Sequence, residues 1–399
     1  MSAVPERRRG PALDVAVVGG GMVGAAAALA LARAGFAAAL VEARAPRPWR
    51  AADEVDLRVV GLAPSSIGLL EAMDVWTSIR ESRASPYAHM HVWDAGSGAA
   101  IDFDAADEGR DLLGYIVENE LVQWTLWQAL EAAGVRRLCP AQVQGFESRG
   151  DRATLALADG EQLSARLLVA ADGADSPLRR MAGIATRGRD YGQRAVVAHV
   201  ATERAHRATA WQRFLPTGPL ALLPLADGRS SLVWSLPEDE ARRVLALDDK
   251  AFLDELGIAS DFRLGRIRAT TPRAAFPLRL QLAGRYQGER LVLLGDAAHT
   301  VHPLAGQGVN LGLRDVAELR DVLVEARAAG RDIGAEHVLR RYARRRQSAD
   351  TLDARGFDAL ARIYAWQSPP LVAARGLGVR LLDRLAPLKR RLAEHAAGG

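Results

Sequence analysis

Gly19-Gly20-Gly21-Met22-Val23-Gly24 is the stretch that decides the fold of this 399-residue chain. It lies between residues 14–18, an apolar run typical of a buried strand, and residues 22–34, which have helical periodicity. In such a turn Gly19 permits the tight bend, Gly21 lets a pyrophosphate approach the backbone, and Gly24 allows the helix to pack closely on the strand. The spacing therefore predicts a dinucleotide-binding β-α-β unit.

An acidic residue follows at the expected distance. Residues 37–42 have the pattern of a second buried strand, and Glu42 ends it, about 20 residues beyond the loop. From there its carboxylate can accept hydrogen bonds from ribose hydroxyls, whereas it would repel a 2′-phosphate. The residues thus favour NAD or FAD over NADP as the tightly bound dinucleotide.

Two later segments also place acidic residues at strand ends. Asp172 opens the run Asp-Gly-Ala-Asp-Ser-Pro-Leu-Arg, which is equally typical of an ordinary strand-to-helix turn with Ser176 as N-cap. Asp296 follows an expected strand at residues 291–294, where it can accept hydrogen bonds from polyol hydroxyls. The loop at residues 303–310 then leads into a helix whose first N–H groups can stabilise negative charge.

Together these segments resemble a known family. G-x-G-x-x-G at residues 19–24, D-G-x-x-S-x-x-R at residues 172–179 and G-D-A-A-H at residues 295–299 are similar to the three fingerprints of para-hydroxybenzoate-hydroxylase-like flavoprotein monooxygenases. The run H-P-L-A-G-Q-G-V-N-L-G-L-R-D at residues 302–315 resembles the more specific signature of the ubiquinone-biosynthesis hydroxylases, which act on 2-polyprenylphenols. The resemblance covers nearly the whole chain.

The expected architecture is an α/β fold with a Rossmann-like FAD-binding domain, an inserted antiparallel-sheet substrate domain and C-terminal helices. The changing pattern along the chain divides it accordingly. The FAD-binding domain is expected from residues 1–75, 101–183 and 281–350. The substrate sheet is expected from residues 76–100 and 184–280, and a C-terminal helical region from residues 351–399.

The resemblance also implies which residues contact FAD. Glu42 and Arg44 would hold the adenosine end, beside the pyrophosphate loop with Gly19, Gly21 and Gly24. The remaining implied cofactor-binding residues are Arg58, Asn119, Asp172, Asp296, Pro303, Gly306, Gln307, Gly308, Val309 and Asn310.

Two loop residues, His302 and Pro303, are candidate catalytic residues. His302 is the titratable side chain best placed beside the flavin, although a loop histidine that packs or caps explains it equally well. No metal site is expected.

By the same resemblance, NADH or NADPH reduces FAD in a transient visit, and O2 then forms a flavin C4a-hydroperoxide that hydroxylates the ring of a polyprenylated phenol. The absence of a second G-x-G-x-x-G unit in the sequence agrees with a transient reductant. Two alternatives stay open. One is another flavin enzyme on this scaffold, such as a halogenase or prenyl reductase; the other is a non-catalytic flavin-binding member of a quinone-biosynthesis complex.

Composition narrows the partners and the location. The net charge is +4 and the arginines are scattered, so nucleic-acid binding is not expected. Cys139 is the single cysteine, which favours a reducing cytoplasm. For the leucine-rich, basic segment at residues 371–391 two interpretations stay open: a helix packed on the body, or a surface that contacts the inner face of the cell membrane or a biosynthetic complex. A homo-oligomer is a further option.

Overall fold

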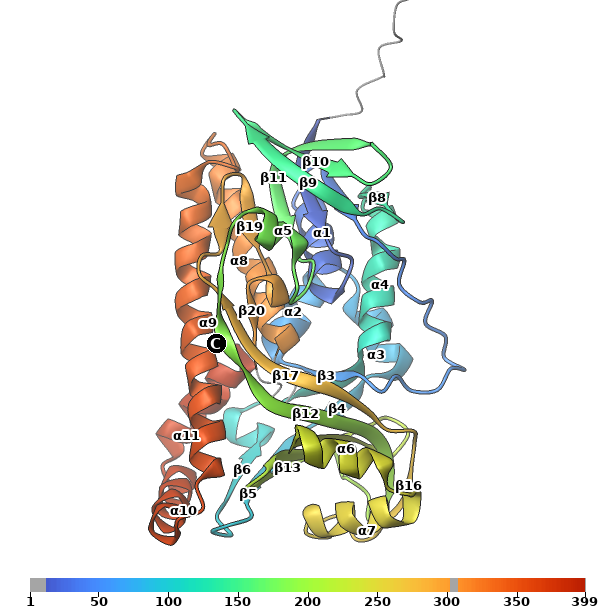
Figure 1. Ribbon diagram of the computed structural model, residues 1–399, viewed down its shortest axis with the longest axis vertical. Helices are drawn as coiled ribbons and strands as arrows, with labels where there is room; N and C mark the ends of the chain where they lie inside the picture. Colours follow the sequence, from blue (N-terminus) through green and yellow to red (C-terminus); the bar gives the residue numbers. More distant parts are fainter. Residues whose placement is uncertain (1–11, 302–307, 399) are drawn as a thin grey trace, which may run out of the picture.

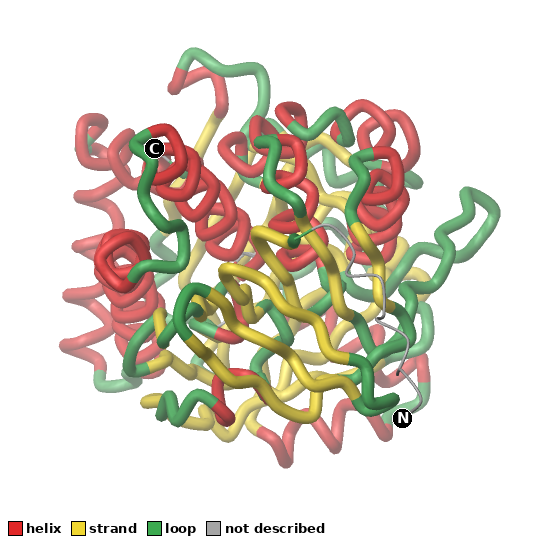
Figure 2. The backbone as a smooth tube through the Cα atoms, turned by 90° about the horizontal axis from the view of Figure 1, so that it is seen from above, coloured by secondary structure: helices red, strands yellow, loops and turns green. Residues whose placement is uncertain are grey.

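The computed structural model describes residues 12–301 and 308–398. Within these residues, an eight-stranded sheet lies toward one end of the elongated molecule and a nine-stranded sheet toward the other (Figure 1). The long helices α8 (Gly308–Ala328) and α9 (Glu336–Ala365) run along one side of the molecule. Seen from above, strands fill the centre and helices surround them (Figure 2).

The eight-stranded sheet has a parallel core in the order β19-β11-β1-β2-β8. The hairpin β9–β10 extends it, because β10 pairs antiparallel with β11. Its strands are β1 (Leu13–Val18), β2 (Ala38–Val41), β8 (Arg136–Leu138), β9 (Val143–Arg149), β10 (Arg152–Leu157), β11 (Gln162–Ala170), β18 (Gln287–Gly288) and β19 (Leu291–Leu293).

The central strands are apolar throughout because both faces of this parallel sheet are covered. β1 is buried along nearly its whole length. α1 (Met22–Arg33) is alanine-rich, and its buried small side chains let it approach the strands and its neighbours α4 (Asn119–Ala132) and α8 closely. The predicted β-α-β unit and the α/β fold class are confirmed.

The glycine loop lies at the point where the strand order of this sheet reverses. β2, the next strand in the sequence, lies on one side of β1, and β11 lies on the other side. In open α/β sheets such a point leaves a crevice beyond the carboxyl ends of the strands, where ligands bind. The loop after Val18 opens into this crevice.

The nine-stranded sheet follows the order β20-β17-β12-β15-β14-β13-β5-β6, with β16 paired to β12. It is antiparallel as predicted except for one pair, because β5 joins β13 in parallel. Its strands are β5 (His89–Asp94), β6 (Ala100–Asp104), β12 (Thr186–Thr202), β13 (Thr209–Leu215), β14 (Gly218–Pro224), β15 (Ser230–Pro237), β16 (Ile267–Thr270), β17 (Ala274–Ala283) and β20 (His299–Thr300). A three-stranded sheet holds β3 (Val59–Leu62), β4 (Ser85–Tyr87) and β7 (Gly114–Glu118).

Two helices within the inserted region were not predicted. α6 (Glu238–Ala246) starts with three acidic residues, and α7 (Asp249–Ala259) is capped by the Asp248 carboxylate, which accepts a hydrogen bond from the N–H of Ala251 at 2.8 Å. Both helices bury apolar side chains against the sheet, including Phe252 and Leu256. These start signals were present in the sequence.

Strand pairing also shifts the ends of the expected segments. β6 belongs to the nine-stranded sheet, so residues 101–104 lie with the inserted sheet and not with the FAD-binding part. β17 continues to Ala283 and pairs with β20, which brings residues 281–283 and 299–300 into the same sheet. The division of the remaining chain into FAD-binding and substrate parts stays a prediction.

The other helices cover the sheets or end the chain. No helix in the described ranges combines the length and the apolarity that a bilayer crossing requires. The remaining helices are α2 (Pro64–Ala72), α3 (Trp76–Arg83), α5 (Pro177–Met181), α10 (Pro369–Arg384) and α11 (Ala386–Ala397), with two short 3-10 turns, η1 (Ala105–Glu108) and η2 (Gly295–Ala297).

Candidate active site

The three glycines of the G-x-G-x-x-G pattern, Gly19, Gly21 and Gly24, are needed for different structural reasons. Gly19 has a φ of +105°, and a Cβ there would lie 2.2 Å from the carbonyl oxygen of Ala171. A Cβ on Gly24 would lie 1.9 Å from the carbonyl oxygen of Gly19. A Cβ on Gly21, in contrast, would meet nothing within 4 Å. The first and third glycines are therefore required by packing, whereas the second leaves an open face for a ligand.

Two side chains brace this loop from neighbouring elements. The Glu42 carboxylate accepts hydrogen bonds from the N–H groups of Gly20 and Arg44, the latter at 2.9 Å. The Gln123 side-chain amide, on α4, donates to the Gly20 carbonyl at 2.8 Å. Glu42 thus lies against the loop, as the spacing predicted. Each of its carboxylate oxygens has a further lone pair that can accept a hydrogen bond from a ligand.

The Asp172 segment supports the site structurally. The Asp172 carboxylate accepts a hydrogen bond from the N–H of Leu178 at 3.1 Å, and Ser176 caps α5 by accepting from the N–H of Arg179 at 3.0 Å. The Arg179 guanidinium reaches across to donate to the Ala297 carbonyl at 2.8 Å. The strand-to-helix turn is confirmed, and it also holds the turn that contains Asp296.

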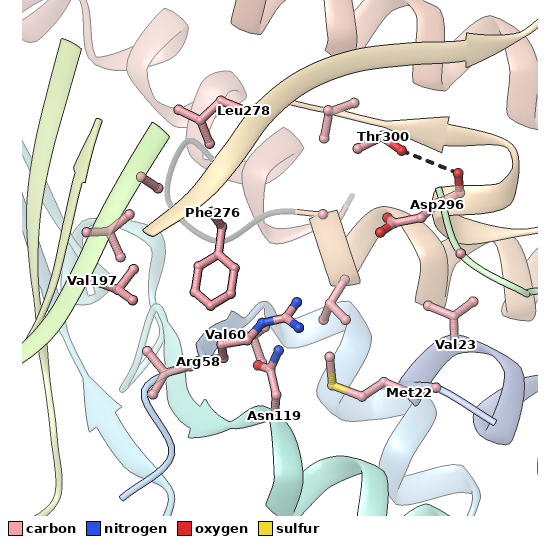
Figure 3. Close-up of a pocket in the computed structure, with 18 of the residues that line it drawn as sticks. Met22, Val23, Arg58, Val60, Asn119, Val197, Phe276, Leu278, Asp296 and Thr300 are labelled. Atoms are coloured by element: carbon pink, nitrogen blue, oxygen red, sulfur yellow. Dashed lines mark hydrogen bonds between the residues drawn. The ribbon is translucent and has the colours of Figure 1, made fainter. Parts of the chain in front are cut away.

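A cavity of about 420 Å³ lies beyond the loop, between the two sheets. Figure 3 shows Arg58 and Asn119 side by side with Met22 next to Asn119, and Asp296 lies across the cavity from them, above Val23. Gly308 and Val309 at the start of α8 also line it. Residues far apart in the sequence, predicted to contact one cofactor, thus meet around one cavity.

An apolar wall closes the far side of this cavity. It is built from strands of the nine-stranded sheet, and the Phe276 ring points into the space (Figure 3). These side chains are Ala195 and Val197 on β12, Leu223 on β14, Val233 on β15, and Phe276 and Leu278 on β17. Sequence reasoning missed them, although alternation within β12 and β17 was a usable signal.

The ionisable side chains lining the described part of the cavity are Arg58, Arg279 and Asp296. The Arg58 guanidinium lies 5.4 Å from the centre of the Phe276 ring. Burial raises the pKa of Asp296, whereas the positive charges of His299 and Arg58 act to lower it. The cavity therefore combines an apolar wall with a few charged side chains, one of which, Arg58, lies over the Phe276 ring of that wall.

Among the described residues, two that were predicted to contact the cofactor are not part of the cavity lining. The Asn310 side chain does not line this cavity: its oxygen accepts hydrogen bonds from Ala63 N–H at 3.0 Å and Ser66 Oγ at 2.7 Å, and its nitrogen donates to the Gly61 carbonyl at 2.7 Å. Asp172 is not among the lining residues, although its neighbours Ala171 and Gly173 are. The predicted residues His302, Pro303, Gly306 and Gln307 lie outside the described residues.

A glycine loop at a sheet switch point, joined to a half-apolar cavity, defines a dinucleotide-binding enzyme of the Rossmann-like class. Comparison with known proteins makes this specific. Residues 12–352 match the family model described as FAD binding domain. In fold, the chain is similar to the crystal structure of p-nitrophenol 4-monooxygenase PnpA from Pseudomonas putida DLL-E4, with a TM-score of 0.78, 18% identity, and coverage of 97% of this chain and 98% of that one.

Two curated relatives are similar over almost their whole length. The 3-demethoxyubiquinol 3-hydroxylase of Escherichia coli (strain K12) is 39% identical, with 96% of this chain and 98% of the relative covered. The ubiquinone hydroxylase UbiL of Rhodospirillum rubrum is also 39% identical, with 96% and 89% covered. This chain belongs to the ubiquinone-biosynthesis hydroxylases, a group of FAD-binding flavoprotein monooxygenases. The predicted family, enzyme class and FAD cofactor are confirmed.

The residues present fit FAD. The open face of Gly21 is a cradle that a Cβ would fill, directly at the start of α1. Two buried oxygens near the cavity, Asn119 Oδ1 and Asp172 Oδ1, have no hydrogen-bond partner among the described residues. Buried polar atoms are rarely left unpaired, so these oxygens are consistent with a bound polar group or ordered water.

Proposed function

We propose that this chain hydroxylates the aromatic ring of a polyprenylated phenol in ubiquinone biosynthesis, with NADH or NADPH as transient reductant and O2 as co-substrate. The observation that carries the proposal is the apolar wall, which lines the same cavity as Arg58, Asn119 and Asp296. A ring with lipophilic substituents would bury apolar surface there. The names of the two relatives support the same class of substrate.

We infer that the residues identified from the sequence contact different parts of FAD. The N–H groups beside Gly21 would hold the pyrophosphate, and Glu42 with Arg44 the adenosine end. Asp296 would accept hydrogen bonds from the ribityl chain, with Arg58 and Asn119 nearby. Asp172 would act through the strand-to-helix turn whose Leu178 N–H it binds, and Gly308 and Val309 would line the ring side.

FAD, when bound, supplies the redox chemistry with O2. The task of the chain is to orient the phenol and keep water away from it. Phe276 and Val197 offer flat and branched apolar surface against which a ring can pack. Because the Arg58 guanidinium lies beside Phe276, a phenol oxygen bound there meets a positive charge, which favours its deprotonated, more electron-rich form.

Oxygen uptake by the holoenzyme tests this proposal. With NADH or NADPH, we expect a phenol carrying a prenyl chain to give hydroxylated product coupled to O2 uptake, and an unsubstituted phenol to give mostly peroxide. Stoichiometric peroxide with every phenol tried would rule the hydroxylase out. A halogenated product, or a reduced prenyl chain, would instead identify one of the alternative flavin enzymes.

We further propose that the C-terminal helices place the enzyme at the inner, anionic face of the cell membrane. α10 lies at one end of the molecule (Figure 1), α11 follows it, and the two helices expose both leucines and cations. A helix pair of this composition fits the interface of an anionic bilayer. The exposed residues are Leu371, Leu377, Leu381, Leu385, Leu388 and Leu392, with Arg380, Arg384, Arg390 and Arg391.

The double variant Leu377→Glu/Leu381→Glu tests the membrane contact. Both side chains are exposed, at 67% and 55%, so the fold should tolerate the change. We expect co-sedimentation with phosphatidylglycerol vesicles to weaken at least about tenfold, because two apolar anchors are replaced by anions. Ile258→Glu, which alters an equally exposed side chain on α7, is the control and should bind normally. Equal binding by all three proteins would contradict the proposal, and a smaller particle in gel filtration would assign the leucines to a homo-oligomer.

A further inference from the structure

A buried ionic cluster lies directly behind the turn that carries Asp296. It consists of His299, Asp315, Asp350 and Arg346, none of which is more than 9% exposed. The Arg346 guanidinium binds both carboxylates, with its Nε 2.6 Å from Asp315 Oδ1. His299 Nε2 lies 2.6 Å from Asp315 Oδ2 and 3.4 Å from Asp350 Oδ2. None of the cofactor-binding residues predicted from the sequence belongs to this cluster.

Asp315 is the residue that connects this cluster to the turn. Its Oδ2 accepts two hydrogen bonds, one from the N–H of Gly295 at 2.8 Å and one from His299. The two donors stand at either end of the Gly295–His299 turn, and Asp296 lies between them. One carboxylate on α8 therefore fixes both ends of the turn, while its second oxygen is fixed to α9 through Arg346.

Three segments that line the cavity pack against one another next to this cluster. A Cβ on Gly312, one turn before Asp315 on α8, would lie 2.5 Å from Val23 Cγ2 and 3.3 Å from the Cα of Gly295. The start of α1, the Asp296 turn and α8 thus pack without space to spare. A turn released by Asp315 could not relax inward, so its displacement would move Asp296 within the cavity.

The charges favour an ion-pair network here over a metal site. Burial alone would lower the pKa of His299, but Asp315 and Asp350 raise it to about 9, so the imidazole is positively charged near neutral pH. Burial and the charge of Asp315 raise the pKa of Asp350 to about 7. Because His299 and Arg346 already supply positive charge to both carboxylates, the cluster balances without a metal ion.

We propose that Asp315 is a positioning residue for the cofactor site: it orients Asp296 by holding both ends of the Gly295–His299 turn, without touching the cofactor itself. This inference rests on the proposed role of Asp296 in the cofactor site. Buried, hydrogen-bonded charge networks behind a site can fix the geometry of side chains in front of it.

Asp315→Asn tests the inference through release of FAD from the holoenzyme on dilution, followed by flavin fluorescence. An asparagine has one acceptor oxygen, so it cannot serve Gly295 and His299 on one side and Arg346 on the other. We expect FAD release to become about tenfold faster, together with a shift of the bound flavin absorption spectrum.

Asp332→Asn is the matched control. Asp332 also accepts from an arginine, Arg290 at 2.6 Å, and from one backbone N–H, that of Gly334 at 3.1 Å, but it contacts no residue of the turn. We expect it to lower the melting temperature and leave FAD release and the flavin spectrum unchanged. Asp296→Ala, as the reference, should release FAD faster than the wild type.

The outcomes distinguish the positioning role of Asp315 from the proposed cofactor-binding role of Asp296. Wild-type release by Asp315→Asn with fast release by Asp296→Ala would overturn the positioning role alone, and wild-type release by both would overturn the role of Asp296 as well. If Asp315→Asn does not fold, His299→Ala and His299→Gln decide. The glutamine keeps a donor near the position of Nε2 and should restore FAD retention that the alanine loses, whereas equal release by both variants and the wild type would overturn the inference.

Discussion

Replacing Gly21 with alanine is expected to abolish tight FAD binding while leaving the apoprotein folded. The backbone at Gly21 has a φ of −66°, which alanine adopts without strain, and the added methyl meets no protein atom within 4 Å. It does occupy the open face where the pyrophosphate must approach the start of α1. Overpacking of a tight contact costs about 1–3 kcal/mol, so we expect the Kd for FAD to rise on the order of 100-fold.

Gly68→Ala is the control for this substitution. Gly68 lies within α2, where an added methyl also meets no atom within 4 Å, but it does not line the cavity. We expect it to stabilise the helix by about 1 kcal/mol without changing FAD binding. Fluorescence titration of the apoproteins with FAD, together with their melting temperatures, distinguishes the two variants. Wild-type FAD affinity in Gly21→Ala would place the pyrophosphate elsewhere.

Replacing Phe276 with alanine is expected to impair substrate use and leave FAD binding intact. The ring is 39% exposed although it lies inside the cavity, so its face is available to a substrate ring and its loss should not unfold the sheet. Removing the apolar contact costs about 2 kcal/mol, which corresponds to about a 30-fold lower kcat/KM for a prenylated phenol. Steady-state kinetics with product analysis would measure this.

Phe262→Ala provides the matched comparison. Phe262 follows α7, is 47% exposed, and does not line the cavity. We expect its kcat/KM to equal that of the wild type. If both variants behaved alike, the apolar wall would not be the substrate surface, and the proposed location of the ring would have to be abandoned.

The parts of the site that the sequence predicted correctly depend on local geometry. Gly24 is required by a contact within the loop, Gly19 by its positive φ at the tight bend, and Ser176 caps the helix that directly follows it. Glu42 lies at the distance that one helix and one strand impose. Such features repeat wherever the same local turn occurs, so spacing alone identifies them.

The remainder depends on pairing between distant segments. Ala195 and Phe276 lie opposite each other only because β12 and β17 pair, and nothing near either residue specifies that register. Asn310 was expected at the flavin, yet its amide is used to hold β3 and α2 to α8. Asp315 ended a recognisable motif, but its partners Gly295, His299 and Arg346 come together only in the folded chain.

Turnover under 18O2 tests the proposed hydroxylation most directly. The FAD-loaded enzyme would be supplied with NADH or NADPH and a polyprenylphenol, and the product analysed by mass spectrometry. We expect one atom of 18O on the aromatic ring of each product molecule, because the inserted oxygen comes from O2. A hydroxylated product without 18O, or O2 consumed wholly as peroxide, would contradict the function proposed for this enzyme.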